Sequence, residues 1–232
     1  MPSEGGEADQ EDEEDGDNWG WWRKDDATGT YAGFEAGMRT VAAAIRDAAP
    51  DGGIDGVLGF SQGGCLAALV AAALEVPRRE PPVGCPAPSP SGGGAAEPDW
   101  SWVQELRDAN AGQPLKFAVV YSGFWAPVPG LQWLYDGTGL GSSTSSGEGP
   151  GSGEMKEGGK IATPTLHFLG SLDSVVEEGR SRALVDRCAD PRVAVHSGGH
   201  YVPVARDRVM PLVGFLREVL ARQEGGEEGG KL

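Results

Sequence analysis

The stretch IDGVLGFSQGGCLAALVAAALEV, residues 54–76, decides the fold class. Ile54 to Phe60 form a short apolar run that suits a buried strand, and the Ala- and Leu-rich residues 63–76 predict a helix. Ser61 lies at the junction, with one glycine two residues before it and another two residues after it. A strand, a sharp turn and a helix therefore follow one another, with a hydroxyl group at the turn.

Gly59-Phe60-Ser61-Gln62-Gly63 matches the nucleophile elbow, the turn that carries the reactive serine of α/β-hydrolases. The turn strains the serine backbone, and we expect side chains at positions 59 and 63 to collide with neighbouring backbone. The backbone amide of Gln62 would open the next helix, where the helix dipole helps it to stabilise an oxyanion. Because 38 of the 232 residues are glycine, a structural glycine-rich turn is the alternative.

Strand and helix patterns alternate around the elbow. Further strands are predicted at Lys116–Ser122, Thr165–Leu169 and Arg192–His196, and further helices at 31–48, 100–110, 177–187 and 207–222. Apolar strands that alternate with helices predict an α/β fold, a three-layer sandwich of the α/β-hydrolase type with a mostly parallel sheet. Four strands are few for this fold, and the shortage is on the N-terminal side, so we expect an N-terminally truncated version.

Asp173 and His200 are the candidates for the acid and base that a reactive serine needs. In α/β-hydrolases the acid and the histidine follow the serine in that order. Asp173 comes just after the strand predicted to end at Leu169, and His200 follows the last predicted strand in Ser197-Gly198-Gly199-His200. The alternative for Asp173 is an N-cap of the next helix, and the alternative for His200 is a surface-loop histidine.

The other two histidines suit the role of base less well. His167 lies inside an apolar strand, so we expect it to pack in the core. His196 ends a strand and could neighbour the site without acting as the base. A metal site made by His196 and His200 lacks a third ligand in a suitable context. The sequence therefore predicts neither a metal nor a cofactor.

Charge and composition limit the partners. Residues 1–17 carry nine of the acidic residues and neither Lys nor Arg, in a chain of formal net charge −16. Such a run predicts an acidic disordered tail over residues 1–18, and an acidic chain is a poor match for nucleic acid or an anionic membrane surface. No apolar run reaches the ~20 residues of a membrane span, and no secretory signal pattern opens the chain.

The three cysteines have no paired spacing and suit reduced thiols, so we expect a cytoplasmic protein, with the nucleus as the alternative. One hydrolase domain is predicted over residues 19–222, with low-complexity insertions at about 77–98 and 137–159. Residues 223–232 predict a second disordered tail. The sequence predicts no particular oligomeric state.

Several motifs together point to one family. They are Gly-Phe-Ser-Gln-Gly-Gly at 59–64, Tyr-Ser-Gly-Phe at 121–124, Pro-Thr-Leu-His-Phe-Leu-Gly-Ser-Leu-Asp at 164–173 and Gly-Gly-His-Tyr-Val-Pro at 198–203. From about Trp19 to Leu220 the chain resembles the eukaryotic FSH group, the family of serine hydrolases. Trp21-Trp22-Arg23-Lys24, with Tyr31 and Gly33, is similar to fungal members.

The resemblance implies a carboxylesterase or acyl thioesterase with a triad of Ser61, Asp173 and His200. Some fungal relatives release acyl or polyketide chains from carrier proteins. Family members begin with a strand that ends in a His-Gly loop, whose backbone amide supplies a second oxyanion donor, and a further strand follows. Here we expect the acidic tail to stand in the place of these elements.

Two hypotheses follow. In the first, the protein cleaves a small-molecule ester or acyl thioester, free or bound to an acyl carrier, through an acyl-enzyme on Ser61. In the second, it is a hydrolase-derived binding or interaction module with impaired catalysis. Expected acyl-group contacts, each with core or lid packing as the alternative, are Phe60, Phe124, Trp125, Trp21 and Trp22.

Overall fold

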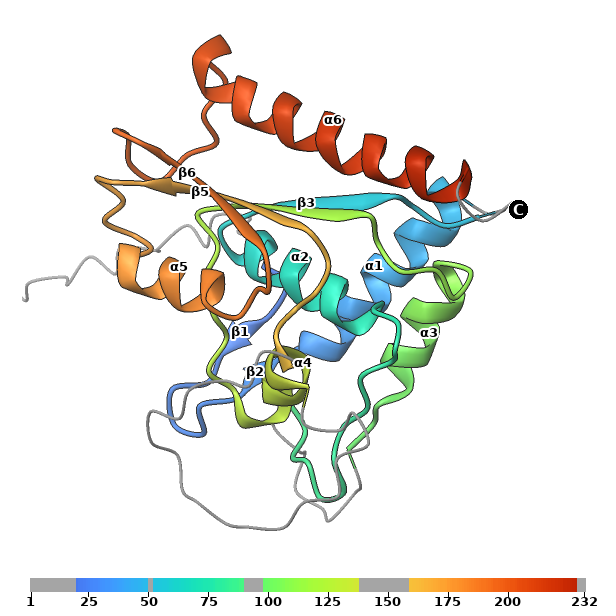
Figure 1. The fold of residues 1–232 in the computed structure, drawn as a ribbon. Coiled ribbons are helices and arrows are strands. Elements are labelled where there is room, and N and C mark those ends of the chain that lie inside the picture. The colour runs from blue at the N-terminus through green and yellow to red at the C-terminus, as the bar shows by residue number, and fades with distance from the viewer. Residues whose placement is uncertain (1–19, 50–51, 90–97, 138–158, 229–232) are drawn as a thin grey trace, which may run out of the picture.

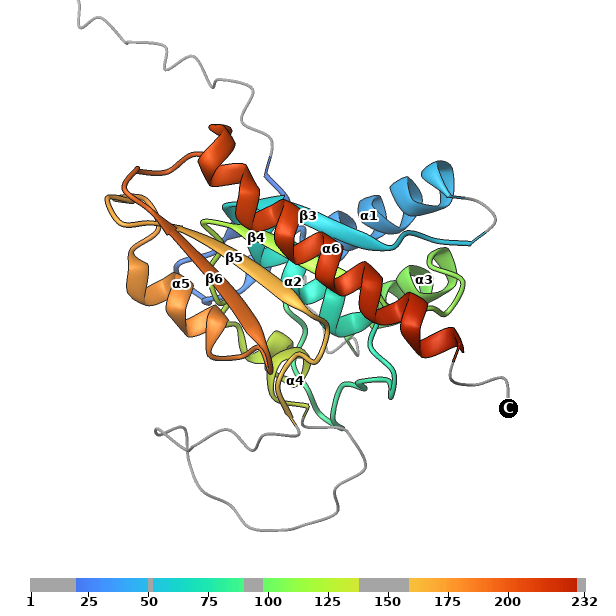
Figure 2. The same cartoon turned by 45° about the horizontal axis from the view of Figure 1, so that its top comes forward.

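A computed structural model describes residues 20–49, 52–89, 98–137 and 159–228 (Figures 1 and 2). The tail predicted at 1–18, most of the insertion predicted at 137–159 and residues 90–97 and 229–232 lie outside the described residues.

Four parallel strands form the central sheet, in the order β3-β4-β5-β6. They are β3 (Gly56–Phe60), β4 (Phe117–Tyr121), β5 (Thr165–Gly170) and β6 (Pro191–His196). Each lies within two residues of a predicted strand. Because neighbouring strands are parallel, their carboxyl ends meet at one edge of the sheet, where Phe60 lies opposite Tyr121.

Helices cover both faces of the sheet, so the predicted three-layer α/β architecture is confirmed (Figures 1 and 2). On one face lie α1 (Phe34–Ala48), α2 (Gln62–Ala73), α3 (Ser101–Ala109) and α5 (Glu178–Val185), and on the other lies α6 (Arg206–Glu228). Residues 64–73 of α2 are all buried, because the helix is apolar on every side. On the opposite face, Phe215 and Val219 of α6 pack against apolar side chains of β4 and β5.

Some element bounds differ from the sequence prediction. The helix predicted at 31–48 begins at Phe34, because β2 (Tyr31–Ala32) pairs antiparallel with β1 (Arg23–Lys24). A turn of 3-10 helix at Pro129–Leu131 and α4 (Gln132–Asp136) lie in a region where the sequence predicted neither helix nor strand. Helix α6 continues to Glu228, into the segment predicted to be a disordered tail.

Within the segment 77–89, part of the linker or surface insertion predicted at 77–98, three residues are buried, namely Arg79, Cys85 and Pro88. Arg79 is buried and donates two hydrogen bonds to the carboxylate of Glu75, at 2.9 and 2.7 Å. Glu75 also accepts the backbone amides of Ala162 and Thr163, at 2.6 and 2.9 Å. This ion pair therefore joins the end of α2 to the segment that leads into β5.

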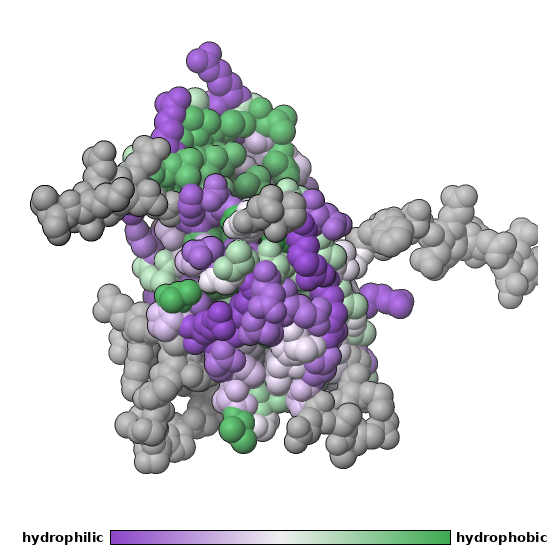
Figure 3. Space-filling model, turned by 90° about the vertical axis from the view of Figure 1, so that its right-hand side faces the viewer, coloured by the Kyte–Doolittle hydropathy of each residue, from purple (hydrophilic) through white to green (hydrophobic). Residues whose placement is uncertain are grey.

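Strand β3 is the edge of the described sheet and has only β4 as a neighbour. Its Leu58 side chain is 58% exposed. Figure 3 shows hydrophobic residues gathered in the upper part of the molecule, at the height of α6.

Within the described ranges, no helix combines the length and the apolar character that a membrane crossing requires.

Candidate active site

Ser61 lies between the end of β3 and the start of α2, with φ 54° and ψ −117°. Positive φ is strained for a residue with a side chain, and such strain is typical of functional positions. Two sets of hydrogen bonds hold the turn. The Ser61 amide donates to the carbonyl of Tyr121 at 2.8 Å, and the Ser61 carbonyl accepts the amides of Gly64 and Cys65 at 3.0 and 3.1 Å.

The glycines of the elbow differ in how tightly they are packed. A β-carbon on Gly59 would lie 1.9 Å from the carbonyl oxygen of Gly63, so the expected collision at position 59 is confirmed. At Gly63 the expectation is wrong, because a β-carbon there would meet only the indole nitrogen of Trp21, at 3.5 Å. The second tight position is Gly64, where a β-carbon would lie 3.0 Å from the α-carbon of Gly123.

The structure brings Ser61, Asp173 and His200 together. Nε2 of His200 lies 2.9 Å from Oγ of Ser61, and Nδ1 of His200 lies 2.8 Å from Oδ2 of Asp173. The His200 side chain is 17% exposed and that of Asp173 only 3%. A partly open imidazole thus joins a hydroxyl group to a buried carboxylate.

Asp173 is held by its own loop as well as by His200. Its Oδ1 accepts the backbone amides of Val175 and Val176, at 3.0 and 2.8 Å. Burial acts to raise the pKa of Asp173, but the hydrogen bonds from His200 and from these amides outweigh it and hold the pKa below its ordinary value. Asp173 is not the N-cap of α5, since Glu177 occupies that position.

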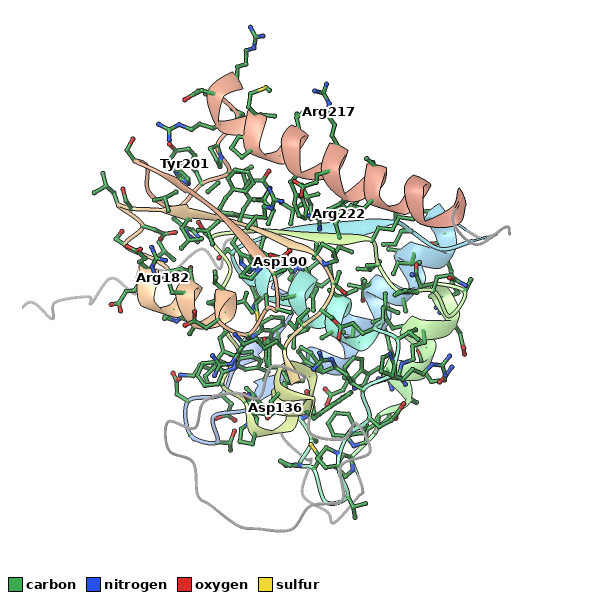
Figure 4. All side chains as sticks on the ribbon, viewed as in Figure 1. Asp136, Arg182, Asp190, Tyr201, Arg217 and Arg222 are labelled. Atoms are coloured by element: carbon green, nitrogen blue, oxygen red, sulfur yellow. The ribbon has the colours of Figure 1, made fainter. Side chains whose placement is uncertain are left out.

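Hydrogen bonds join the loops that carry the acid and the base. The amide of Ser171 donates to His196 at 2.8 Å, and that of Leu172 donates to Gly198 at 3.0 Å. A β-carbon on Gly170 would lie 2.6 Å from the carbonyl of Gly198, so the close approach requires glycine at position 170. Tyr201, next to His200, is labelled in Figure 4 beside the loop that follows β6.

The remaining histidines lie as expected. His167 is buried in β5, 3.1 Å from Oγ1 of Thr165, and burial lowers its pKa to about 4. His196 is buried beside the site, and its ring packs against that of Tyr201 at a tilt of 56°, with centroids 5.2 Å apart. Burial, followed by the charge of Arg208, lowers the pKa of His196. Among the described residues, no group of three or more acidic, His or Cys side chains could hold a metal ion.

The side chain of Gln62 has a role that the sequence did not reveal. Its Oε1 accepts the Trp21 amide at 2.7 Å, and its Nε2 donates to the Trp22 carbonyl at 2.9 Å. These two hydrogen bonds fix the Trp21–Trp22 segment beside the elbow. The Gln62 backbone amide stands in the first turn of α2, where amides have no partner within the helix.

Phe60 and Trp21 are the most open of the expected acyl-group contacts, each with 37% of its surface exposed. The Phe60 ring lies 4.7 Å from that of His200. Trp22, by contrast, is buried and stacks on Tyr31, with centroids 5.0 Å apart. Trp22 is therefore a core residue, which was the alternative to an acyl-group contact.

Phe124 and Trp125 are half-buried, and arginines of the α5 segment stack on both. The guanidinium of Arg180 lies 4.5 Å from the Phe124 ring centroid, and that of Arg187 lies 3.7 Å from the Trp125 ring. The Ser181 hydroxyl donates to the Gly123 carbonyl at 2.7 Å. The loop after β4 is thereby fixed to α5.

Trp21 is among the lining residues of two hollows. One has a volume of about 740 Å³ and is lined by residues of the 20–23 segment, β2 and α1. The other, of about 330 Å³, is mostly apolar and runs between α1, β3 and α2. Their lining residues do not include Ser61, Asp173 or His200.

The family model described as "Serine hydrolase (FSH1)" matches residues 2–212. The chain belongs to this family of serine hydrolases. Membership agrees with the strained serine, the histidine and the carboxylate that the fold brings to one edge of the sheet.

Curated relatives of this serine hydrolase include named esterases. "Esterase OVCA2" of Danio rerio is 26% identical over 88% of the chain and 69% of the relative. "Esterase CG5412" of Drosophila melanogaster is 26% identical over 90% of the chain and 59% of the relative. A Schizosaccharomyces pombe protein named "Dihydrofolate reductase" is 26% identical over 82% of the chain. The chain spans about a third of that protein and of a second relative from the same yeast, 30% and 34%.

Among solved structures, Zea mays acyl-protein thioesterase 2 resembles this serine hydrolase with a TM-score of 0.48 and 18% identity. The match covers 87% of the chain and 72% of the plant protein. A likeness this distant carries no information about the substrate.

Proposed function

We propose that this serine hydrolase cleaves carboxylic esters or acyl thioesters through an acyl-enzyme. Oγ of Ser61 attacks the acyl carbon while Nε2 of His200 takes the hydroxyl proton, and the Gln62 backbone amide stabilises the oxyanion. The alcohol or thiol then leaves with the proton from His200. A water molecule, deprotonated by His200, attacks the acyl carbon of the acyl-enzyme. The Ser61 oxygen leaves with that proton from His200, which releases the carboxylic acid and the free serine.

The observation that carries this proposal is the pair of hydrogen bonds at 2.9 and 2.8 Å that link Ser61, His200 and Asp173. Asp173 is ionised at neutral pH because its pKa lies below the ordinary value, so its Oδ2 accepts a hydrogen bond from Nδ1–H of His200. Nε2 of the neutral imidazole then has a free lone pair directed at the serine hydroxyl. This tautomer is the one that a general base requires.

Support for the substrate class comes from family membership and from the exposed aromatic rings of Phe60 and Trp21 beside the site. We propose a small-molecule ester or acyl thioester, free or bound to a carrier, whose acyl group contacts these rings. Contact with Phe124 and Trp125 is a further part of the proposal, since both remain half-buried rather than fully enclosed.

Labelling with a fluorophosphonate probe tests the proposal. We expect an adduct on Ser61, found by peptide mass spectrometry, and hydrolysis of p-nitrophenyl esters or acyl thioesters that falls at least about 10³-fold in Ser61→Ala. Ser171→Ala is the matched control, because this exposed serine lies in the Asp173 loop and bonds to His196 through its backbone only. Folded protein without an adduct would overturn the proposal and favour a hydrolase-derived binding module.

A further inference from the structure

Ser122 is a strained and buried serine whose role the proposed reaction leaves open. It directly follows β4, has φ 46° and is 2% exposed. Its amide donates to the Phe168 carbonyl at 2.9 Å, and the preceding carbonyl, that of Tyr121, accepts the Ser61 amide. Residues 121 and 122 therefore join the nucleophile turn to β5, the strand that leads to Asp173.

Glycine would be the natural residue for this backbone. Left-handed φ is unstrained for glycine and strained for serine, so a requirement for the turn alone would favour glycine. The next residue is in fact Gly123. A buried serine in this conformation indicates that the hydroxyl group itself has a role in the protein.

The Ser122 hydroxyl makes no well-aligned hydrogen bond among the described residues, although it is buried. Buried polar atoms without partners are rare and need a physical reason. Asp173 is the ionisable group whose pKa the Ser122 hydroxyl affects. Burial raises the pKa of Asp173, while His200, the backbone amides and the Ser122 hydroxyl lower it, so that the pKa lies below its ordinary value. The backbone places both residues at the carboxyl edge of the sheet, because Ser122 directly follows β4 beside Phe168 of β5 and Asp173 comes three residues after β5.

The lone pairs of Asp173 leave one place for this donor. A carboxylate has about four acceptor sites, two on each oxygen. The amides of Val175 and Val176 occupy both sites of Oδ1, and His200 occupies one site of Oδ2. The fourth site is on Oδ2, and a hydroxyl group can rotate to direct its proton there.

We infer that Ser122 is a positioning residue whose hydroxyl donates to Oδ2 of Asp173, loosely in the free enzyme and tightly while His200 holds the proton taken from Ser61. Hydrogen bonds of a catalytic site are often loose in the free enzyme and tighten in the transition state. The bond would keep the carboxylate aligned with Nδ1 when the imidazole becomes charged. This inference rests on the proposed hydrolase function.

Ser122→Gly and Ser122→Ala test it, because both remove the hydroxyl group and only glycine also removes the backbone strain. We expect Ser122→Gly to unfold at the same or a higher denaturant concentration than wild type. Its kcat for an ester should fall about 10- to 100-fold, as for a lost hydrogen bond to a charged group, with KM within about threefold. Ser122→Cys, which keeps a weak donor, should recover part of the loss.

Ala111→Gly is the matched control. Ala111 is the other described residue with a side chain and positive φ outside the elbow, at 52°, and it lies in the turn before the amino end of β4, away from the site. We expect this variant to gain stability with unchanged kcat. Wild-type kcat in Ser122→Gly would overturn the inference, and so would a loss of kcat that only accompanies a loss of stability.

The proton between His200 and Asp173 gives a readout that does not need turnover. In the proton NMR spectrum of wild type, the Nδ1–H signal of His200 should lie far downfield. We expect it to move in Ser122→Gly and Ser122→Ala and to stay unchanged in Ala111→Gly. A wild-type protein that neither labels nor hydrolyses overturns the proposed function alone, and an unmoved signal in both Ser122 variants overturns the role of Ser122.

Discussion

The α-carbon of Gly59 faces the carbonyl oxygen of Gly63 so closely that a β-carbon on residue 59 would lie 1.9 Å from that oxygen. The atom in the way belongs to the backbone of α2, which cannot move without displacing Ser61. We expect Gly59→Ala to destabilise the protein by about 3 kcal/mol or more and to abolish labelling of Ser61. Denaturant unfolding and a fluorophosphonate probe measure the two effects.

Gly63→Ala is the matched substitution in the same motif. A β-carbon on residue 63 lies in ordinary contact with Trp21, at 3.5 Å, and alanine favours a helix over glycine by up to about 1 kcal/mol. We expect unchanged or increased stability and retained labelling. Equal damage at both positions would contradict the different packing of the two glycines.

The Gln62 side chain should stabilise the segment that carries Trp21. Gln62→Leu removes both hydrogen bonds to the Trp21–Trp22 backbone and retains the backbone amide at position 62. We expect a loss of about 1–3 kcal/mol in unfolding free energy, faster hydrogen exchange of the Trp21 amide, and continued labelling of Ser61. The control is Gln104→Leu, which removes an exposed bond to Asp108 and should change the stability little.

The buried pair of Arg79 and Glu75 should contribute much more to stability than an exposed pair. Their side chains are 2% and 9% exposed, and Arg79→Met would leave the Glu75 charge buried without its counter-ion. We expect a loss of about 3–5 kcal/mol. Arg182→Met removes the ion pair with Glu178 on the outer side of α5 (Figure 4) and should change the stability by less than about 1 kcal/mol. Similar losses in both variants would argue against the role given to burial.

His167 should make the protein less stable in acid. Its pKa is about 4 when folded against an ordinary 6.5, so between these pH values the unfolded chain binds more protons. The stability is complete above pH 6.5 and falls as the pH drops towards 4, by about 3 kcal/mol in total. We expect His167→Gln to show a shallower loss of unfolding free energy over this range. A slope equal to that of wild type would contradict the burial of a neutral imidazole.

Local patterns in the sequence were enough to predict the four strands, their parallel arrangement and the chain order of Ser61, Asp173 and His200. These features depend on apolar runs and on residues that directly follow them. The family shown by the comparison agrees with the resemblance found from the motifs. The distances that join the three residues depend on loops that meet only in the fold, such as those tied together through Gly170 and Gly198.

Contacts between distant segments account for what the sequence did not reveal. The crowding at Gly64 comes from Gly123, and buried Arg79 bonds to the carbonyl of Gly159, in the segment before β5. The sequence gives no sign that the Ser122 backbone is strained, although Ser122 belongs to the Tyr-Ser-Gly-Phe motif that supports the family resemblance. Trp22 has the same residue type as Trp21 but packs inward, because Tyr31 and Phe34 lie beneath it.

The open edge of β3 affects how the protein behaves at high concentration. In the described part of the chain β3 pairs on one side only, and an unpaired strand edge with exposed apolar residues such as Leu58 is a template for aggregation. The net charge of −16 opposes this, because molecules of like charge repel one another in solution. Salt at about 0.1 M already reduces that repulsion to a range of about 10 Å. Colloidal stability should therefore fall as the ionic strength rises, and concentrated stocks should keep best at low salt.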